Sequence, residues 1–163
     1  MSWGSGVKLA AVVAALAVPA IAATPGVAIA QGIVSTLAGD WRGSGRIFYT
    51  DGSSEGVRCT AYYTGSGNEL RMAIQCQSDT NPIHMRSRLR IDGGRASGEW
   101  EERTFNAGGT ASGSVSGSAL NLSITGGGLS GTMAVSFSRS AHTVSVSTEG
   151  IPMRRVSVNF SRR

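Results

Sequence analysis

The chain has 163 residues, of which 15% are charged and 6% are aromatic, and its formal net charge is +5. This length fits one domain with a hydrophobic core. The cations are scattered along the chain, which argues against the clustered charge of a nucleic-acid-binding protein. A mild attraction to anionic lipid or polysaccharide is compatible with this charge.

Residues 1–30 have the pattern of an export signal. Lys8, the only lysine, precedes an apolar run over residues 9–22. This run is shorter than the roughly 20 apolar residues that a membrane-spanning helix needs, so the pattern favours a cleaved signal over an uncleaved membrane anchor. We therefore expect an exported protein, either periplasmic or secreted.

The boundary of the signal follows from its small residues, because signal peptidases recognise small side chains at alternate positions. This pattern predicts cleavage after Ala30 or, as a second possibility, after Ala22. We expect a signal peptide over residues 1–30 and a single domain over residues 31–163.

The domain has the sequence period of half-buried β-strands. After residue 30, apolar residues alternate with Ser, Thr, Arg and Gly, and no segment shows helical spacing, so we expect no helix there. Short glycine-containing turns separate the alternating segments. Ten strands are predicted, over residues 40–50, 55–65, 69–77, 84–91, 95–105, 109–117, 119–125, 129–138, 142–149 and 152–161.

These strands predict an all-β fold. Each strand has one apolar face, and consecutive strands are close enough in sequence to pair in antiparallel fashion. Closing such a curled sheet removes the exposed edges of its first and last strands. We predict a single antiparallel up-and-down β-barrel of about 8–10 strands, with a two-sheet β-sandwich as the alternative.

The two cysteines predict a disulfide. An exported protein meets an oxidising compartment, where a pair of cysteines is expected to bridge. A two-residue loop at Gly67-Asn68 would place Cys59 directly opposite Cys76 in an antiparallel hairpin. Cysteines opposed in this way are close enough to form a disulfide.

A second hairpin is predicted around Gly93-Gly94. A two-residue loop there places Ser87 opposite Trp100 on the apolar face, which also carries Glu102. The same register sets two pairs of opposite charge on the other face, and such pairs stabilise neighbouring strands. These pairs are Arg88 with Glu99 and Arg86 with Glu101.

The first hairpin requires a different loop. A two-residue loop at Asp51-Gly52 would turn arginines onto the apolar face, because a slip of one residue reverses every side chain. An odd loop length or a bulge avoids this problem. It places Trp41, Ile47 and Tyr49 on the apolar face, together with Val57 and Tyr63.

The segment Gly39-Asp40-Trp41 resembles the opening of the calycin group, which includes lipocalins and fatty-acid-binding proteins. In lipocalins this tryptophan closes one end of the barrel, and an arginine of the last strand packs across it. The resemblance implies that Trp41 closes the barrel. It makes Arg154 the candidate for the arginine that packs across Trp41, because alternate residues of a strand face the same side and Arg154 alternates with Val156, Val158 and Phe160.

Two narrower resemblances start from the same segment. Bacterial metalloprotease inhibitors of the small-barrel type have a similar opening and one disulfide, and they inhibit through an extended N-terminal segment, here residues 31–36. Nitrobindin-like haem barrels resemble the glycine pattern over residues 39–45 but need a proximal histidine. Only His84 and His142 are available, and neither has a matching context.

Catalytic and metal sites are not indicated. Glu99, Glu101 and Glu102 are adjacent acids, but two of them face arginines, and we see no nucleophile paired with a base. His142 shares the inner parity of the strand, but its place at a strand start favours a surface or rim position. We therefore predict a protein that is not an enzyme and has no metal or other cofactor.

A small apolar or amphipathic ligand is the expected partner, because a barrel of ten strands encloses more space than its side chains need to fill. The alternative is that the inward side chains only pack the core. The candidate lining residues are Tyr63, Met72, Met85, Trp100, Glu102, Met133, Phe137 and Arg154.

Two other functions remain open. A protein-binding module, such as a periplasmic protease inhibitor, would use the barrel surface or the N-terminal segment. An outer-membrane β-barrel would show the same alternation with the apolar face outward, but the chain has few aromatic residues and no pair of aromatic girdles.

Overall fold

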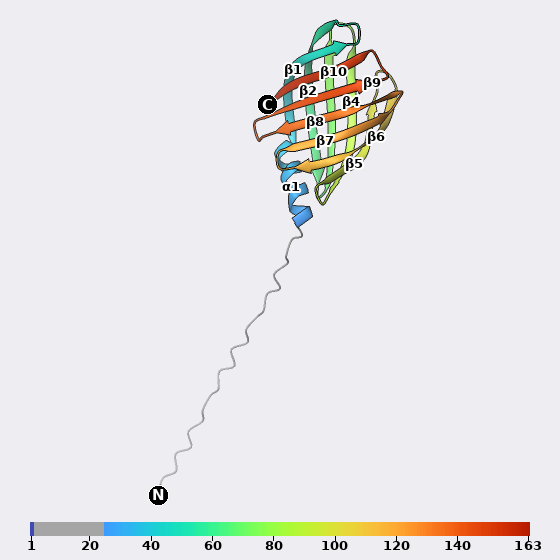
Figure 1. Ribbon diagram of the computed structural model, residues 1–163. Helices are drawn as coiled ribbons and strands as arrows, with labels where there is room; N and C mark the ends of the chain where they lie inside the picture. Colours follow the sequence, from blue (N-terminus) through green and yellow to red (C-terminus); the bar gives the residue numbers. More distant parts are fainter. Residues whose placement is uncertain (2–24) are drawn as a thin grey trace.

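The computed structural model describes Met1 and residues 25–163. Within residues 25–163 one helix, α1 (Pro25–Leu37), precedes ten strands (Figure 1). The strands are β1 (Gly39–Tyr49), β2 (Ser54–Ser66), β3 (Glu69–Ser78), β4 (Pro82–Asp92), β5 (Arg95–Glu102), β6 (Ala107–Ser116), β7 (Ala119–Gly126), β8 (Leu129–Phe137), β9 (Ala141–Glu149) and β10 (Met153–Arg162).

The strands form one closed barrel in which each strand pairs with its neighbours in sequence and β1 pairs with β10. All the pairings are antiparallel. The predicted up-and-down barrel is therefore confirmed, with ten strands, and the sandwich is not formed. In Figure 1, β7–β10 run across the strands β2–β4 that lie behind them.

The predicted hairpin registers are confirmed. Cys59 lies opposite Cys76 and forms the disulfide, with 4.0 Å between the two Cα atoms. The first hairpin has the odd loop length: Phe48 pairs with Ser54, and the Tyr49 amide donates to the carbonyl of Ser53. As a result Trp41 faces the interior.

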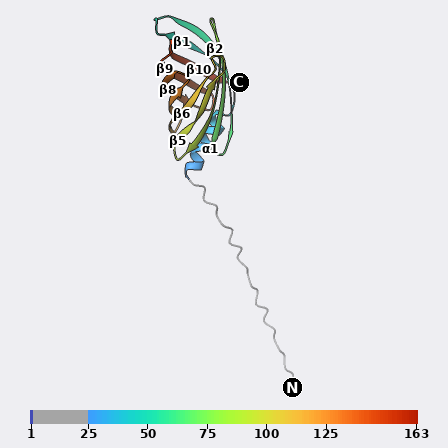
Figure 2. The same cartoon turned by 90° about the vertical axis from the view of Figure 1, so that its right-hand side faces the viewer.

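The expectation that the domain contains no helix is wrong. Helix α1 packs against β2, β3 and β4 at the end of the barrel where the chain enters (Figures 1 and 2). Ala30, Ile33, Val34 and Leu37 recur at helical spacing, and all four are buried against the barrel. Assigning residues 1–30 to a signal separated Ala30 from the other three positions of this pattern. In the part of the chain that the structure describes, no helix has the length and hydropathy of a membrane span.

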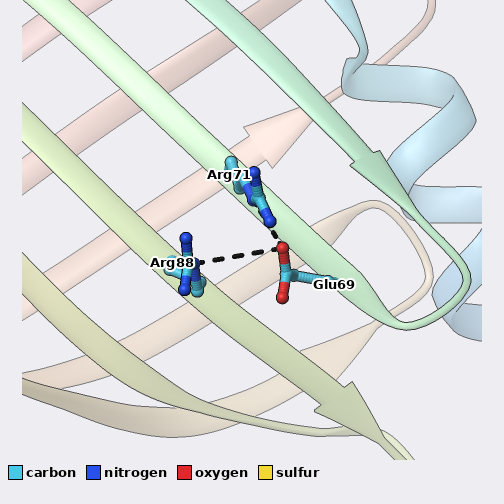
Figure 3. Close-up of polar contacts among 3 residues, drawn as sticks. All are labelled: Glu69, Arg71 and Arg88. Atoms are coloured by element: carbon cyan, nitrogen blue, oxygen red, sulfur yellow. Dashed lines mark hydrogen bonds and ion pairs between the residues drawn. The ribbon is translucent and has the colours of Figure 1, made fainter.

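The charges on the outer face pair differently from the prediction. The arginine–glutamate pairs of β4 and β5 are in register, but the ion pairs among the described residues involve Glu69 instead. Glu69 lies 2.5 Å from Arg71 and 4.0 Å from Arg88 (Figure 3). Because Arg71 and Arg88 oppose each other across β3 and β4, one carboxylate relieves the repulsion between them.

Candidate functional site

One end of the barrel interior is closed by a cluster around Trp41, which is fully buried. The Trp41 Nε1 donates a hydrogen bond to the carbonyl of Leu37 at 2.8 Å, which ties β1 to the last turn of α1. The guanidinium of Arg162 lies 4.2 Å from the centroid of the Trp41 ring. This is the arrangement that the calycin resemblance implies, a tryptophan of the first strand covered by an arginine of the last.

The arginine over Trp41 is Arg162 and not Arg154. The register of β10 shifts where Phe48 pairs with Arg155 and Tyr49 pairs with Met153, so Arg154 is an extra residue in a bulge. A bulge breaks the alternation of inward and outward side chains. Arg154 is consequently exposed on the outside of the barrel, in a hollow over β7–β9.

Arg162 also holds the end of α1. Its Nη2 donates to the carbonyl of Thr36 at 2.6 Å, and its Nη1 donates to that of Ala38 at 2.8 Å. A cation is favourable at this position, because the last carbonyls of a helix are unpaired and carry partial negative charge. Gly39 makes room for this contact: its φ is +119°, and a Cβ there would lie 2.9 Å from Nη1. The glycine of the Gly-x-Trp motif is thus explained.

His142 lies inside the closed end, where only 3% of its surface is exposed. Its ring stacks on Phe160 at 4.5 Å, and its Nε2 lies 2.9 Å from the Tyr63 hydroxyl. Burial, together with the charge of Arg162, lowers the pKa of His142 to about 4. Burial also raises the pKa of Tyr63, so both groups are neutral near pH 7.

The expected surface or rim position of His142 is therefore wrong. The reason is that its ring packs among the inward aromatic side chains Trp41, Tyr63 and Phe160. The ring packs on Phe160 and its Nε2 lies against the Tyr63 hydroxyl, whereas its Nδ1 is buried without a hydrogen-bond partner among the described residues. His84 is exposed on the outer face. Among the described residues, no three potential metal ligands gather.

A second region of the interior, which we call the Trp100 wall, consists of Met72, Met85, Ser87 and Trp100 on β3, β4 and β5. Ser87 lies opposite Met72 on one side and opposite Trp100 on the other. The Ser87 Oγ and the Trp100 Nε1 are buried and have no hydrogen-bond partner among the described residues. The register of this hairpin was expected from the sequence, whereas Ser87 was not among the candidate lining residues.

Two glycines flank Trp100 on the inner face. Gly98 precedes it by two residues on β5, and Gly109 lies opposite it on β6. A Cβ at Gly98 would lie 1.9 Å from the carbonyl oxygen of Arg88, and one at Gly109 would lie 1.8 Å from that of Thr125. Side chains cannot be placed at these positions without moving the neighbouring strand, so none extends from either position beside the indole.

Glu102 is buried at the end of β5, where both of its oxygens are engaged. They accept hydrogen bonds from the backbone amides of His84 and Phe105, each at 2.7 Å. This carboxylate therefore joins β4 to the turn after β5. It supplies neither a free acid nor a free acceptor to the interior.

The candidate lining residues fall into separate places. Tyr63 belongs to the closed end, and Phe137 lies opposite His142 beside it. Met72, Met85, Trp100 and Glu102 come from the neighbouring strands β3–β5, whereas Met133 faces inward from β8. Arg154 alone lies outside.

The comparisons with known proteins agree with the fold. The chain matches no family model and no curated protein sequence. Its structure is similar to the crystal structure of Rv2717c from M. tuberculosis, with a TM-score of 0.64 and 15% sequence identity, over 82% of this chain and 97% of that chain. The likeness supports the closed antiparallel barrel fold described above.

Proposed function

We propose that this protein is a non-enzymatic, exported binding protein whose barrel takes a small amphipathic ligand beside the Trp100 wall. The ligand has an apolar body and one neutral hydrogen-bond acceptor, such as a carbonyl oxygen. The apolar body suits the methionines and the indole. The acceptor suits the two neutral donors, Ser87 Oγ and Trp100 Nε1.

The observation that carries this proposal is the pair of unpartnered donors on adjacent strands. A buried polar group without a partner costs about 1–3 kcal/mol, and folded proteins leave few of them. Two such groups side by side on an apolar wall are typical of a site that holds a polar atom of a ligand.

The residues around these donors can adapt to a ligand. Met72 and Met85 have flexible, polarisable side chains that repack at low cost. Met85 is only partly buried, which leaves it freer than the leucines of the core. Gly98 and Gly109 keep side chains off the strands beside the indole.

The same geometry disfavours the other functions. Residues 31–36 lie in α1 and are not the extended segment through which barrel-type protease inhibitors act. The outward residues of the strands are mostly polar or charged, whereas lipid would require them to be apolar. His142 and Glu102 are both engaged in structural contacts, so they do not form an acid–base pair.

The proposal can be tested with two probes of matched shape, 2-decanone and decane. Native mass spectrometry of the purified protein, before and after organic extraction, would first show whether it carries a ligand. Thermal denaturation with each probe should then show stabilisation by 2-decanone that exceeds stabilisation by decane. One hydrogen bond contributes about 1 kcal/mol, which corresponds to roughly a fivefold difference in affinity.

Variants connect this preference to the site. Trp100→Phe and Ser87→Ala should each reduce the preference for the ketone. Ser97→Ala, on the exposed face of β5, serves as the matched control and should keep it. If neither probe stabilises the protein and extraction releases nothing, the interior is a packed core and the proposal is wrong.

A further inference from the structure

A groove of about 710 Å³ lies on the outside of the barrel, over the strands around β1 and away from the Trp100 wall. Strands β1, β2, β3, β4 and β10 contribute to it, and each of them places polar side chains there. The lining residues are Arg42, Gly43, Ser44, Arg58, Cys59, Thr60, Gln75, Cys76, Gln77, His84, Asn159, Ser161 and Arg163.

The groove carries positive charge that is not neutralised. Arg42, Arg58 and Arg163 are exposed, and none of them forms an ion pair among the described residues. No aspartate or glutamate belongs to the described lining. Arg42 pairs with Thr60 and Ser44 with Arg58, so the two arginines are diagonal neighbours on adjacent strands, roughly 7–8 Å apart at the backbone.

Amides lie beside these cations. Gln75 pairs with Thr60 and Gln77 with Arg58, and both side chains point outward. Asn159 lies on the other side, opposite Ser44. Its Oδ1 accepts a hydrogen bond from Thr143, which leaves its amide group as a donor toward the groove.

This chemistry distinguishes among anionic partners. Arginines bind carboxylates through paired hydrogen bonds, and amides and hydroxyls donate to and accept from sugar hydroxyls. No Trp, Tyr or Phe belongs to the described lining, whereas single-stranded nucleic acid is usually held by stacking on such side chains. The described lining also contains no large apolar side chain that could enter a bilayer.

We propose that this groove binds an acidic polysaccharide whose sugar units carry carboxylates, of the uronate type. The carboxylates bind Arg42 and Arg58, and the sugar hydroxyls bind the amides of Gln75 and Asn159 and the Oε1 of Gln77, whose Nε2 donates to the carbonyl of Ser78. This site is independent of the interior ligand site, because its polar side chains lie on the outer face, mainly on β1, β2 and β10, whereas the Trp100 wall lies on the inner face of β3, β4 and β5.

Isothermal titration calorimetry with oligogalacturonate tests the proposal. The double variant Arg42→Gln/Arg58→Gln should weaken binding at least tenfold. The double variant Arg90→Gln/Arg95→Gln removes the same charge from exposed positions outside the groove and should weaken it less than threefold. Gln75→Ala should weaken binding without any change of net charge.

Other probes define the outcomes that overturn the proposal. Dextran, a neutral polysaccharide, should not bind. Equal weakening by both double variants would mean that binding follows net charge and not the groove. Binding to phosphatidylglycerol vesicles or to single-stranded DNA in place of oligogalacturonate would assign the groove to another partner. Unchanged unfolding curves of all variants confirm that they remain folded.

Discussion

Arg162 lies across Trp41 and at the same time binds the carbonyl of Thr36 in α1 and that of Ala38 just after it, so one side chain joins the first strand, the last strand and the helix. The contact with Ala38 spans 124 residues of sequence. It locks the helix onto the end of the barrel that Trp41 closes.

Replacing Arg162 should loosen this end of the barrel. Arg162→Gln removes a charge-assisted contact with α1 and the stacking on Trp41, and we expect a loss of about 1–3 kcal/mol in the free energy of unfolding. Arg162→Lys should recover little of this stability, because the ammonium group of lysine cannot stack on Trp41 and donate to two carbonyls as the planar guanidinium group does. Urea denaturation measures the loss, and hydrogen exchange should show faster exchange in α1. Arg154→Gln, an exposed control, should change neither the free energy of unfolding nor the exchange of α1. Equal effects of Arg154→Gln and Arg162→Gln would contradict the role of Arg162.

The buried His142 should make stability depend on pH. Its pKa is about 4 in the folded protein and 6.5 in the unfolded chain. Between these values only the unfolded chain takes up the proton, so the free energy of unfolding falls as pH drops from 6.5 to 4, by about 2–3 kcal/mol in total. Urea denaturation at several pH values should show this slope in the wild type.

The variant His142→Gln removes the titrating group and should flatten the slope in that pH window, whatever its overall stability. His84→Gln, at an exposed position, should keep the wild-type slope. Identical slopes for the wild type and His142→Gln would assign the pH dependence to other groups.

Gly98 should not tolerate a side chain. A Cβ there would overlap the carbonyl oxygen of Arg88, which belongs to the neighbouring strand and cannot move alone. We expect Gly98→Ala to cost about 1–3 kcal/mol of stability. Gly56→Ala is the matched control, since no atom lies within 4 Å of its added Cβ; it should be neutral or slightly stabilising. A neutral Gly98→Ala would show that the strands are less closely paired there.

If the protein is exported as proposed, the structure also predicts where the mature chain begins. Cleavage after Ala30 would leave only seven residues of α1, too few for a stable helix, and would remove the buried Ala30. We therefore expect N-terminal sequencing of exported protein to give Ala23, after the alternative site at Ala22. A chain that begins at Gln31 should unfold at lower urea concentration than one that begins at Ala23. Equal stability of the two would remove the argument against cleavage after Ala30.

The strands of this fold could be predicted because their information is local. A period of two residues marks each strand, and the turn residues fix which residues face each other. The disulfide followed from the same reasoning, since the Gly67-Asn68 loop alone sets Cys59 opposite Cys76. The odd loop of the first hairpin followed from the cost of turning arginines inward.

The features that sequence missed depend on more than one element. The apolar positions of α1 adjoin the apolar run at the start of the chain, so the two patterns merged. The burial of His142 depends on Trp41, Tyr63 and Phe160, which come from three other strands. The position of Arg154 depends on a bulge that no turn residue announces. The two unpartnered donors of the Trp100 wall become visible only when the hydrogen bonds of every buried group are counted.

Closure of the barrel between β1 and β10 has a consequence for how the chain folds. The first strand has only β2 beside it until the last strand has been made, and a barrel without β10 has two open edges. Contacts of such long sequence separation form late and slowly. The whole chain must therefore emerge before the barrel can close, so a shortened chain that ends before Met153 should aggregate instead of forming a smaller barrel.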